Sequence, residues 1–178
     1  LDDHLGNGVV IENTYGSVVS GNMIEECKGI AIILDRDCYG IALSANVIAH
    51  DGGGIALRDA HGCAVSANAF TIMGSDALNI GPQSGRITVT GNNFSNSYIG
   101  EGKTKRSASD QAAGGLALDG TSGITIVGNL FSGLRPKALA IKGDPSRSIV
   151  FTDNVLIDAS SDHKKLDASL VKDNLDDR

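Results

Sequence analysis

The chain has 178 residues, a formal net charge of −6, and 41% hydrophobic but only 4% aromatic residues. The acidic balance argues against nucleic-acid binding, which requires a positively charged face. No apolar run in the sequence reaches the length of a membrane span. The 23 glycines suit many tight turns, so we expect one domain with a slim aliphatic core.

The most regular feature of the sequence is an asparagine that recurs in one local phrase, in most copies Ser-x-Asn or Thr-x-Asn. The six copies end at Asn22, Asn46, Asn68, Asn92, Asn129 and Asn154. Their spacings are 24, 22, 24, 37 and 25 residues. A period longer than a strand and shorter than a domain indicates a solenoid in which each repeat is one coil.

Each repeat contains three short segments in which apolar residues alternate with others, and we predict that all three are strands. In chain order, the first segment lies at residues 8–11, 29–32, 54–57, 77–80, 115–118 and 138–141. The second segment precedes each asparagine, and the third follows it. Coils stacked about 4.8 Å apart allow every strand to pair in parallel with its equivalent one repeat later.

We therefore predict an all-β fold, a parallel β-helix of about six coils over residues 1–157. The asparagines are assigned a structural role between the second and third strands. An asparagine tolerates the left-handed backbone region, and its amide can bond to the backbone and to the next asparagine in the stack.

The phrase Gly-Ile-x-Leu, a variable turn, then Ile-x-Val-Ser-x-Asn-x-Phe resembles the right-handed, single-stranded parallel β-helix repeats of the pectate lyase-like superfamily. The resemblance covers about residues 8–157. It is specific for the fold but not for the reaction, because the superfamily includes polysaccharide lyases, glycoside hydrolases, fructotransferases, tailspikes and adhesins. It also implies that the active groove follows the outward face of the first strand.

The two ends of the chain differ from the repeats. The sequence begins at Leu1 within the repeat pattern, so we expect missing upstream coils or a partner chain to cover the first coil. A homo-oligomer is one such possibility. Residues 158–178 are interpreted as a polar tail or cap. There the helical spacing of Leu166, Leu170, Val171 and Leu175 predicts a short helix that covers the last coil.

The outward residues of the first strands form two columns in our alignment. The first column is small in most coils and reads Val10, Ala31, Ala56, Asn79, Ala117 and Ala140. The second is more charged and reads Glu12, Ile33, Arg58, Gly81, Asp119 and Lys142. The turns before these strands add His50, Asp51, Asp76, Arg135 and Lys137. The 37-residue spacing reflects an insertion over about residues 98–113 in one of these turns.

Four residues are candidates for catalysis: Asp76, Asp119, Lys142 and Arg58. In a lyase, Lys142 or Arg58 would remove a proton beside a uronate carboxylate, while Ca²⁺ held by Asp76 and Asp119 neutralises the charge. In a glycoside hydrolase or fructotransferase, Asp76 and Asp119 would flank the scissile bond as two carboxylates. The structural alternative is that Asp119 and Lys142, one coil apart, form an ordinary surface ion pair.

Six residues are candidates for substrate binding: Asn79, His50, Lys103, Lys105, Arg106 and Lys137. They lie on the groove strand, in the turns before it, or in the insertion. We expect an extracellular or cell-surface protein that binds and cleaves a polysaccharide or oligosaccharide. The alternative is a non-catalytic β-helix for glycan binding or tailspike-type assembly. The histidines and cysteines show no metal-ligand spacing, so Ca²⁺ is the cofactor to consider.

Overall fold

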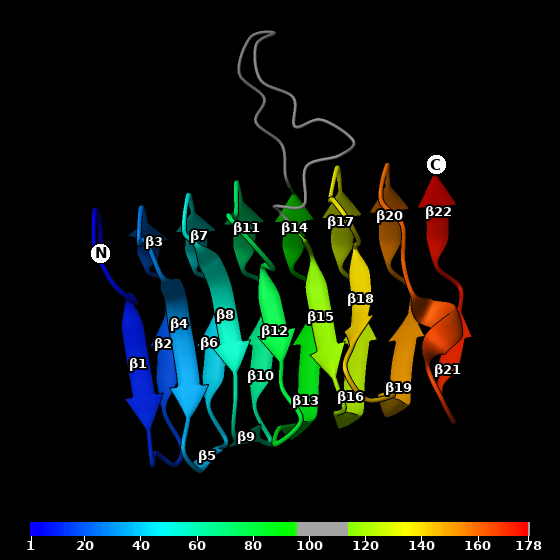
Figure 1. The fold of residues 1–178 in the computed structure, drawn as a ribbon, viewed down its shortest axis with the longest axis horizontal. Coiled ribbons are helices and arrows are strands. Elements are labelled where there is room, and N and C mark those ends of the chain that lie inside the picture. The colour runs from blue at the N-terminus through cyan, green and yellow to red at the C-terminus, as the bar shows by residue number, and fades with distance from the viewer. Residues whose placement is uncertain (96–113, 178) are drawn as a thin grey trace, which may run out of the picture.

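The structure, a computed structural model, describes residues 1–95 and 114–177. Over these ranges the chain is a right-handed parallel β-helix, in which three sheets run side by side along one axis (Figure 1). Every strand pair among the described residues is parallel, and each coil contributes a strand to each sheet in turn, except that the last coil adds none to the first sheet. The predicted fold class, with about six coils of three strands, is confirmed.

The three sheets are named here by their order within a coil. Sheet 1 contains β1 (Val9–Glu12), β4 (Ile30–Asp35), β8 (Gly53–Leu57), β12 (Leu78–Ile80), β15 (Leu116–Asp119) and β18 (Leu139–Lys142). Sheet 2 contains β2 (Val18–Ser20), β6 (Ala42–Ser44), β10 (Ala64–Ser66), β13 (Gly85–Thr90), β16 (Ser122–Val127), β19 (Arg147–Thr152) and β21 (Leu170–Lys172), with β5 (Cys38–Tyr39) and β9 (Ala60–His61) beside them. Sheet 3 contains β3 (Met23–Glu25), β7 (Val47–Ala49), β11 (Ala69–Thr71), β14 (Asn93–Ser95), β17 (Leu130–Ser132), β20 (Val155–Ile157) and β22 (Leu175–Asp177).

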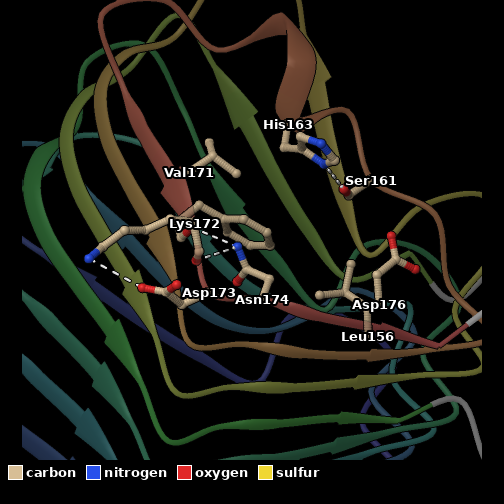
Figure 2. A pocket seen from close by; sticks show the side chains of 9 residues that line it. Leu156, Ser161, His163, Val171, Lys172, Asp173, Asn174 and Asp176 are labelled. Carbon is tan, nitrogen blue, oxygen red and sulfur yellow. Dashed lines mark hydrogen bonds and ion pairs between the residues drawn. The ribbon is translucent and has the colours of Figure 1, made fainter.

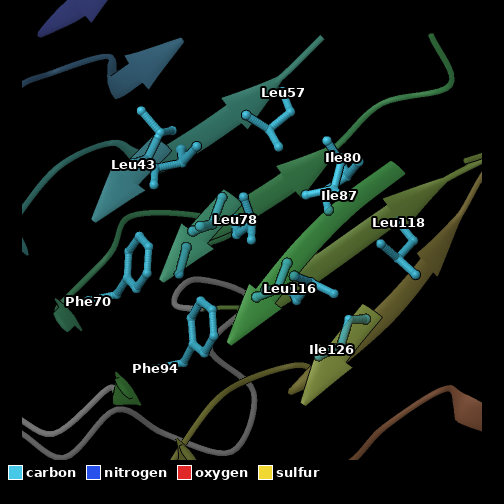
Figure 3. Close-up of a cluster of buried hydrophobic side chains, with 14 of the residues drawn as sticks. Leu43, Leu57, Phe70, Leu78, Ile80, Ile87, Phe94, Leu116, Leu118 and Ile126 are labelled. Carbon is cyan, nitrogen blue, oxygen red and sulfur yellow. The ribbon is translucent and has the colours of Figure 1, made fainter. Parts of the chain in front are cut away.

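The core is a set of aliphatic and aromatic columns that run parallel to the axis (Figure 3). Phe70, Phe94 and Phe131 stack on one another in sheet 3, with ring centroids 4.8 Å apart at both steps. This spacing matches the distance between paired strands, so like side chains lie on like. The strand predicted after each asparagine is therefore present and buries one column of side chains.

The asparagine turn, between sheets 2 and 3, has the same hydrogen bonds in successive coils. Asn92 Oδ1 accepts bonds from the backbone N–H and the Nδ2 of Asn68, each 3.0 Å long. Asn92 Nδ2 in turn donates to Asn129 Oδ1 at 3.0 Å. The equivalent contacts extend to Asn174, which the sequence alignment did not include.

The left-handed residue of this turn is not the asparagine itself. The positive φ angle belongs to the residue before it, which is Gly21, Ala45, Ala67, Gly91, Gly128, Asp153 or Asp173. The expectation that asparagine was chosen for the left-handed region is therefore wrong in detail. Its side chain is selected instead because both ends of the amide find partners in neighbouring coils.

The predicted C-terminal helix is also wrong. Leu170 and Val171 lie in β21 and Leu175 lies in β22, and these strands pair with β19 and β20. The reason is that residues 170–174 repeat the apolar pair and asparagine found at residues 150–154, so they continue the ladders of sheets 2 and 3. Among the described residues the one helical segment is a 3₁₀ turn at His163–Lys165, next to β18 (Figure 1).

The outward columns of sheet 1 agree with the alignment except in the second coil. Ile33 lies between Val10 and Ala56, in the position that the alignment gave to Ala31. Asp35 is the partner of Glu12, in the position given to Ile33. The alignment treated Gly29 as equivalent to Gly8, which was wrong by two residues. Because the side-chain period of a strand is two, this error left the buried and outward faces unchanged.

Candidate functional site

A pocket of about 270 Å³ lies on the outward face of sheet 1, at the amino ends of its last strands. It is lined by Ser75, Asp76, Gly114, Pro136, Lys137, Ala140 and Lys142. Most of these residues belong to the groove turn, the connection from sheet 3 to sheet 1 at residues 26–29, 50–52, 72–77 and 133–138. Ala140 and Lys142 are alternate residues of β18, so both point outward. This pocket is called the Asp76 pocket below.

Asp76 and Lys142 form an ion pair in this pocket, although they belong to different coils. The Asp76 side chain is 19% exposed and that of Lys142 is 48% exposed. The predicted pair between Lys142 and Asp119 is not what the lysine forms. The two are opposite each other in the register of β15 and β18, but the flexible lysine stem turns toward Asp76.

Lys137 is held at the edge of the Asp76 pocket by Asp162. Its Nζ lies 3.1 Å from Asp162 Oδ1, while Lys165 Nζ lies 3.2 Å from Oδ2. Partial burial of Asp162 acts to raise its pKa, but hydrogen bonds from both lysines outweigh it and hold the pKa below its ordinary value. Asp162 was missed from the sequence, because it lies in the segment interpreted as a polar tail or cap. Asp76 and Asp162 thus orient the lysines that line the pocket.

The structure does not bring Arg58 to the Asp76 pocket. Arg58 Nη1 lies 3.5 Å from Asp35 Oδ2, at the carboxyl ends of the sheet 1 strands β4 and β8. A similar pair, Arg36 with Glu12, lies one coil earlier. These contacts form a row of exposed ion pairs, which is the arrangement expected of a solvated edge.

The predicted substrate-binding residues fall in three places. Asn79 lies in the outward column between Ala56 and Ala117. His50 lies in the groove turn, where its Nδ1 is 4.0 Å from Glu26 Oε1. Lys137 lines the Asp76 pocket. The remaining three, Lys103, Lys105 and Arg106, lie outside the described residues.

A second pocket, of about 310 Å³, lies in the groove turn of the earlier coils and is called the Asp51 pocket below. It is lined by Cys27, Lys28, His50, Asp51, Gly52, Ile72 and Gly74. Asp51 Oδ1 accepts a 2.8 Å hydrogen bond from the backbone N–H of Cys27. Burial raises the pKa of Asp51, and burial together with the Asp51 contact raises the pKa of the Cys27 thiol to about 11.

A third pocket, of about 200 Å³, lies at the C-terminal end of the solenoid (Figure 2). Phe151 and Leu156 form its apolar wall, while Ser161 and His163 lie on its polar side. Ser161 Oγ and His163 Nδ1 are 2.5 Å apart. The pocket exists because β21 and β22 place few apolar side chains over the core of the preceding coil.

Comparisons with known proteins support the fold and a family. The family described as periplasmic copper-binding protein (NosD) matches residues 3–132. No curated protein is significantly similar to the chain in sequence. The crystal structure of DFA-IIIase from Arthrobacter chlorophenolicus A6 in complex with GF2 is similar, with a TM-score of 0.55 and 14% identity. That match covers 97% of this chain and 57% of that chain, so the chain spans little more than half of that enzyme.

The described residues do not fit the copper site that the family description suggests. Across residues 1–95 and 114–177, no three His, Cys, Asp or Glu side chains are grouped so that they could hold a metal ion. Cys27, His50 and Asp51 line one pocket, but a metal-bound thiol is deprotonated and the pKa of Cys27 is raised. The predicted calcium ligand Asp76 is engaged by Lys142.

Within the part of the chain that the structure describes, no helix has the length and hydrophobicity needed to cross a membrane.

Proposed function

Because the chain belongs to the NosD family and folds as a parallel β-helix, we propose that it is an extracytoplasmic protein that binds and cleaves a polysaccharide along sheet 1. The observation that carries the proposal is the Asp76 pocket, where a carboxylate and two ammonium groups meet beside small outward residues. Ligand pockets commonly combine an apolar floor with a few polar groups that fix the orientation of the ligand. The same fold in DFA-IIIase, whose structure contains GF2, is consistent with the proposal.

Two carboxylates are the proposed catalytic groups. Asp76 lies in the pocket itself. Asp119 does not line the pocket, but it is the β-ladder partner of Lys142, which contacts Asp76. One carboxyl group would protonate the leaving oxygen, and the other would activate water or attack the sugar. Lys142 would orient Asp76 and bind a sugar oxygen.

An ion-paired Lys142 favours this mechanism over β-elimination. A lysine that acts as a general base must have a free amine aimed at the substrate proton, whereas the Lys142 amine is directed at the Asp76 carboxylate. Arg58, the other predicted base, is paired with Asp35 and does not line the pocket. Hydrolysis or glycosyl transfer is therefore the preferred reaction.

The test is cleavage of a panel of substrates that contains GF2, fructans, glucans and uronate polymers. New reducing ends would report hydrolysis, and absorbance from unsaturated products would report elimination. We expect Asp76→Asn and Asp119→Asn each to lower turnover by about 100-fold or more while the thermal midpoint stays constant. Glu12→Gln, at the equivalent outward position of the first coil, is the matched control and should retain activity.

The outcomes separate the competing functions. Saturable binding without cleavage, weakened by Lys142→Met, would favour the non-catalytic glycan-binding alternative. Unsaturated products would restore the lyase mechanism. If no polymer is bound or cleaved, the proposal is wrong.

A further inference from the structure

Asp51 occupies a position where four other coils have apolar side chains within the described residues. The equivalent residues, five positions after the asparagine, are Cys27, Met73, Leu134 and Ala159, and all four are buried. Asp51 is itself only 2% exposed. A carboxylate in a core column is costly unless all its oxygens are bonded.

One oxygen of Asp51 is not bonded. Oδ1 accepts the Cys27 N–H and the carboxylate also contacts the Cys27 thiol, but no group lies within hydrogen-bonding geometry of Oδ2. Among the described residues it is the one buried side-chain nitrogen or oxygen in this condition. Packing does not explain the carboxylate, because methionine or leucine fills the same column in other coils. The unpaired oxygen instead belongs to a side chain that lines the Asp51 pocket.

The Asp51 pocket and the Asp76 pocket adjoin each other. Gly74 lines the first and Ser75, the next residue, lines the second. The backbone N–H of Gly74 donates to Asp51 O at 2.8 Å, and Ser75 Oγ donates to Gly52 O at 2.7 Å. A chain of sugars bound along the solenoid axis at Asp76 would therefore reach Asp51 in the preceding coil.

On these grounds we propose that the Asp51 pocket is a second sugar subsite of the same groove, in which Asp51 Oδ2 accepts a hydrogen bond from a sugar hydroxyl. The inference rests on the proposed polysaccharide function. A hydroxyl is the chemistry that fits, since the pocket offers an acceptor beside a protonated thiol and contains no metal-binding group among the described residues. A neutral sugar unit satisfies the orphan oxygen without adding a charge.

The experiment measures binding of oligosaccharides of two to six units, drawn from the fructan, glucan and uronate series, by calorimetry. In the wild-type protein we expect affinity to rise once the ligand is long enough to enter both pockets. Asp51→Asn keeps an acceptor for the Cys27 N–H and replaces Oδ2 by a donor. This substitution should lower the affinity for long ligands about tenfold and leave the affinity for short ligands unchanged.

A second measurement follows modification of Cys27, which lines the Asp51 pocket, by a thiol reagent at pH 9. A bound hexasaccharide should slow this modification, while Cys38 and Cys63 in the same chain serve as internal controls. Protection of Cys27 by Cu⁺ or Zn²⁺ but by no sugar would overturn the assignment. If short ligands bind but length adds no Asp51-dependent affinity, only the second subsite is wrong. If no ligand binds, the proposed function and this inference both fail.

Discussion

The asparagine turn and the groove turn are two corners of the same coils. They differ in how far the residue type varies from one coil to the next. The asparagine turn has one residue type in seven successive positions, because each amide is bonded by the amides before and after it. The groove turn has a different residue in almost every coil, and its charged side chains bond across coils in irregular pairs. Where equivalent side chains in neighbouring coils satisfy each other's hydrogen bonds, stacking restricts the position to one residue type. Where they do not, side chains are available for ligands.

The largest expected effect on stability is in the stacked, periodic part of the coils. Phe94→Ala removes a ring that stacks on Phe70 and Phe131, and it leaves a cavity that the rigid strands cannot close. We expect a loss of about 3–5 kcal/mol in the free energy of unfolding, measured by urea denaturation. Asn93→Ala, at the exposed neighbouring position, should change it by less than about 0.5 kcal/mol. Equal effects would show that the stacked column is not the source of stability.

The next effect concerns the ladder itself. Asn92→Ala removes the acceptor for two groups of Asn68 and the donors to Val65 O and Asn129 Oδ1. A loss of about 2–3 kcal/mol is expected, because buried partners are left unpaired. Asn22→Ala, at the exposed first rung, should cost less than half as much. A flat series along the ladder would contradict the idea that neighbours fix the residue.

A smaller effect, with the opposite sign, is expected in the groove turn. Burial raises the pKa of Asp51 above its value of 3.8 in the unfolded chain, so the folded state binds the proton more tightly. Stability from this group is complete below about pH 4 and falls as pH rises through the folded pKa. Asp51→Asn should remove this decline and raise stability at pH 7 by about 1 kcal/mol.

The pH dependence of the urea midpoint tests this prediction. The charged and titratable groups around Asp51 are Cys27, Lys28 and His50, with Glu26 paired to His50. His50→Gln is the control, since a decline that disappears in this variant would be due to the imidazole. Asp162 does not contribute to this decline of stability with rising pH. Its pKa is lowered, so its contribution is present above about pH 4 and is lost only as pH falls further.

The smallest effect on stability is expected at the Asp76 pocket. Lys142→Met breaks a partly exposed ion pair, for which a change of less than about 1 kcal/mol is typical. Differential scanning calorimetry should show nearly equal midpoints for the variant and the wild type. A large loss would place Lys142 with the scaffold rather than with the site.

The sequence contained enough information for the fold but only part of the site. The repeat located all three strands, the outward column that contains Asn79 and the second outward column that contains Asp119 and Lys142, because stacking makes these positions periodic. The error at Gly29 arose because a glycine in one turn was equated with a glycine in another. The last coil was missed because Leu170, Val171 and Leu175 suit both a helical spacing and the repeat.

The site contacts were harder to predict because they are not periodic. The contact of Lys142 with Asp76 depends on the conformation of a long side chain, which a strand register does not determine. Asp162 pairs with Lys137 from a segment outside the aligned repeats. Asp51 could have been found, since counting five residues from Asn46 places it in a column that is apolar in four other coils.

One hydrogen bond of the ladder has a wider consequence for how such a chain changes. Asn92 and Asn129 are 37 residues apart, yet their amides meet at 3.0 Å, as do those of Asn46 and Asn68, which are 22 residues apart. The extra chain leaves sheet 3 after β14 and returns at β15 without altering the phase of the stack. Each coil is thus a module coupled only to its neighbours. Segments can be added or lost at the groove turn, so the ligand specificity can change while the stacked phenylalanine and asparagine columns remain unchanged.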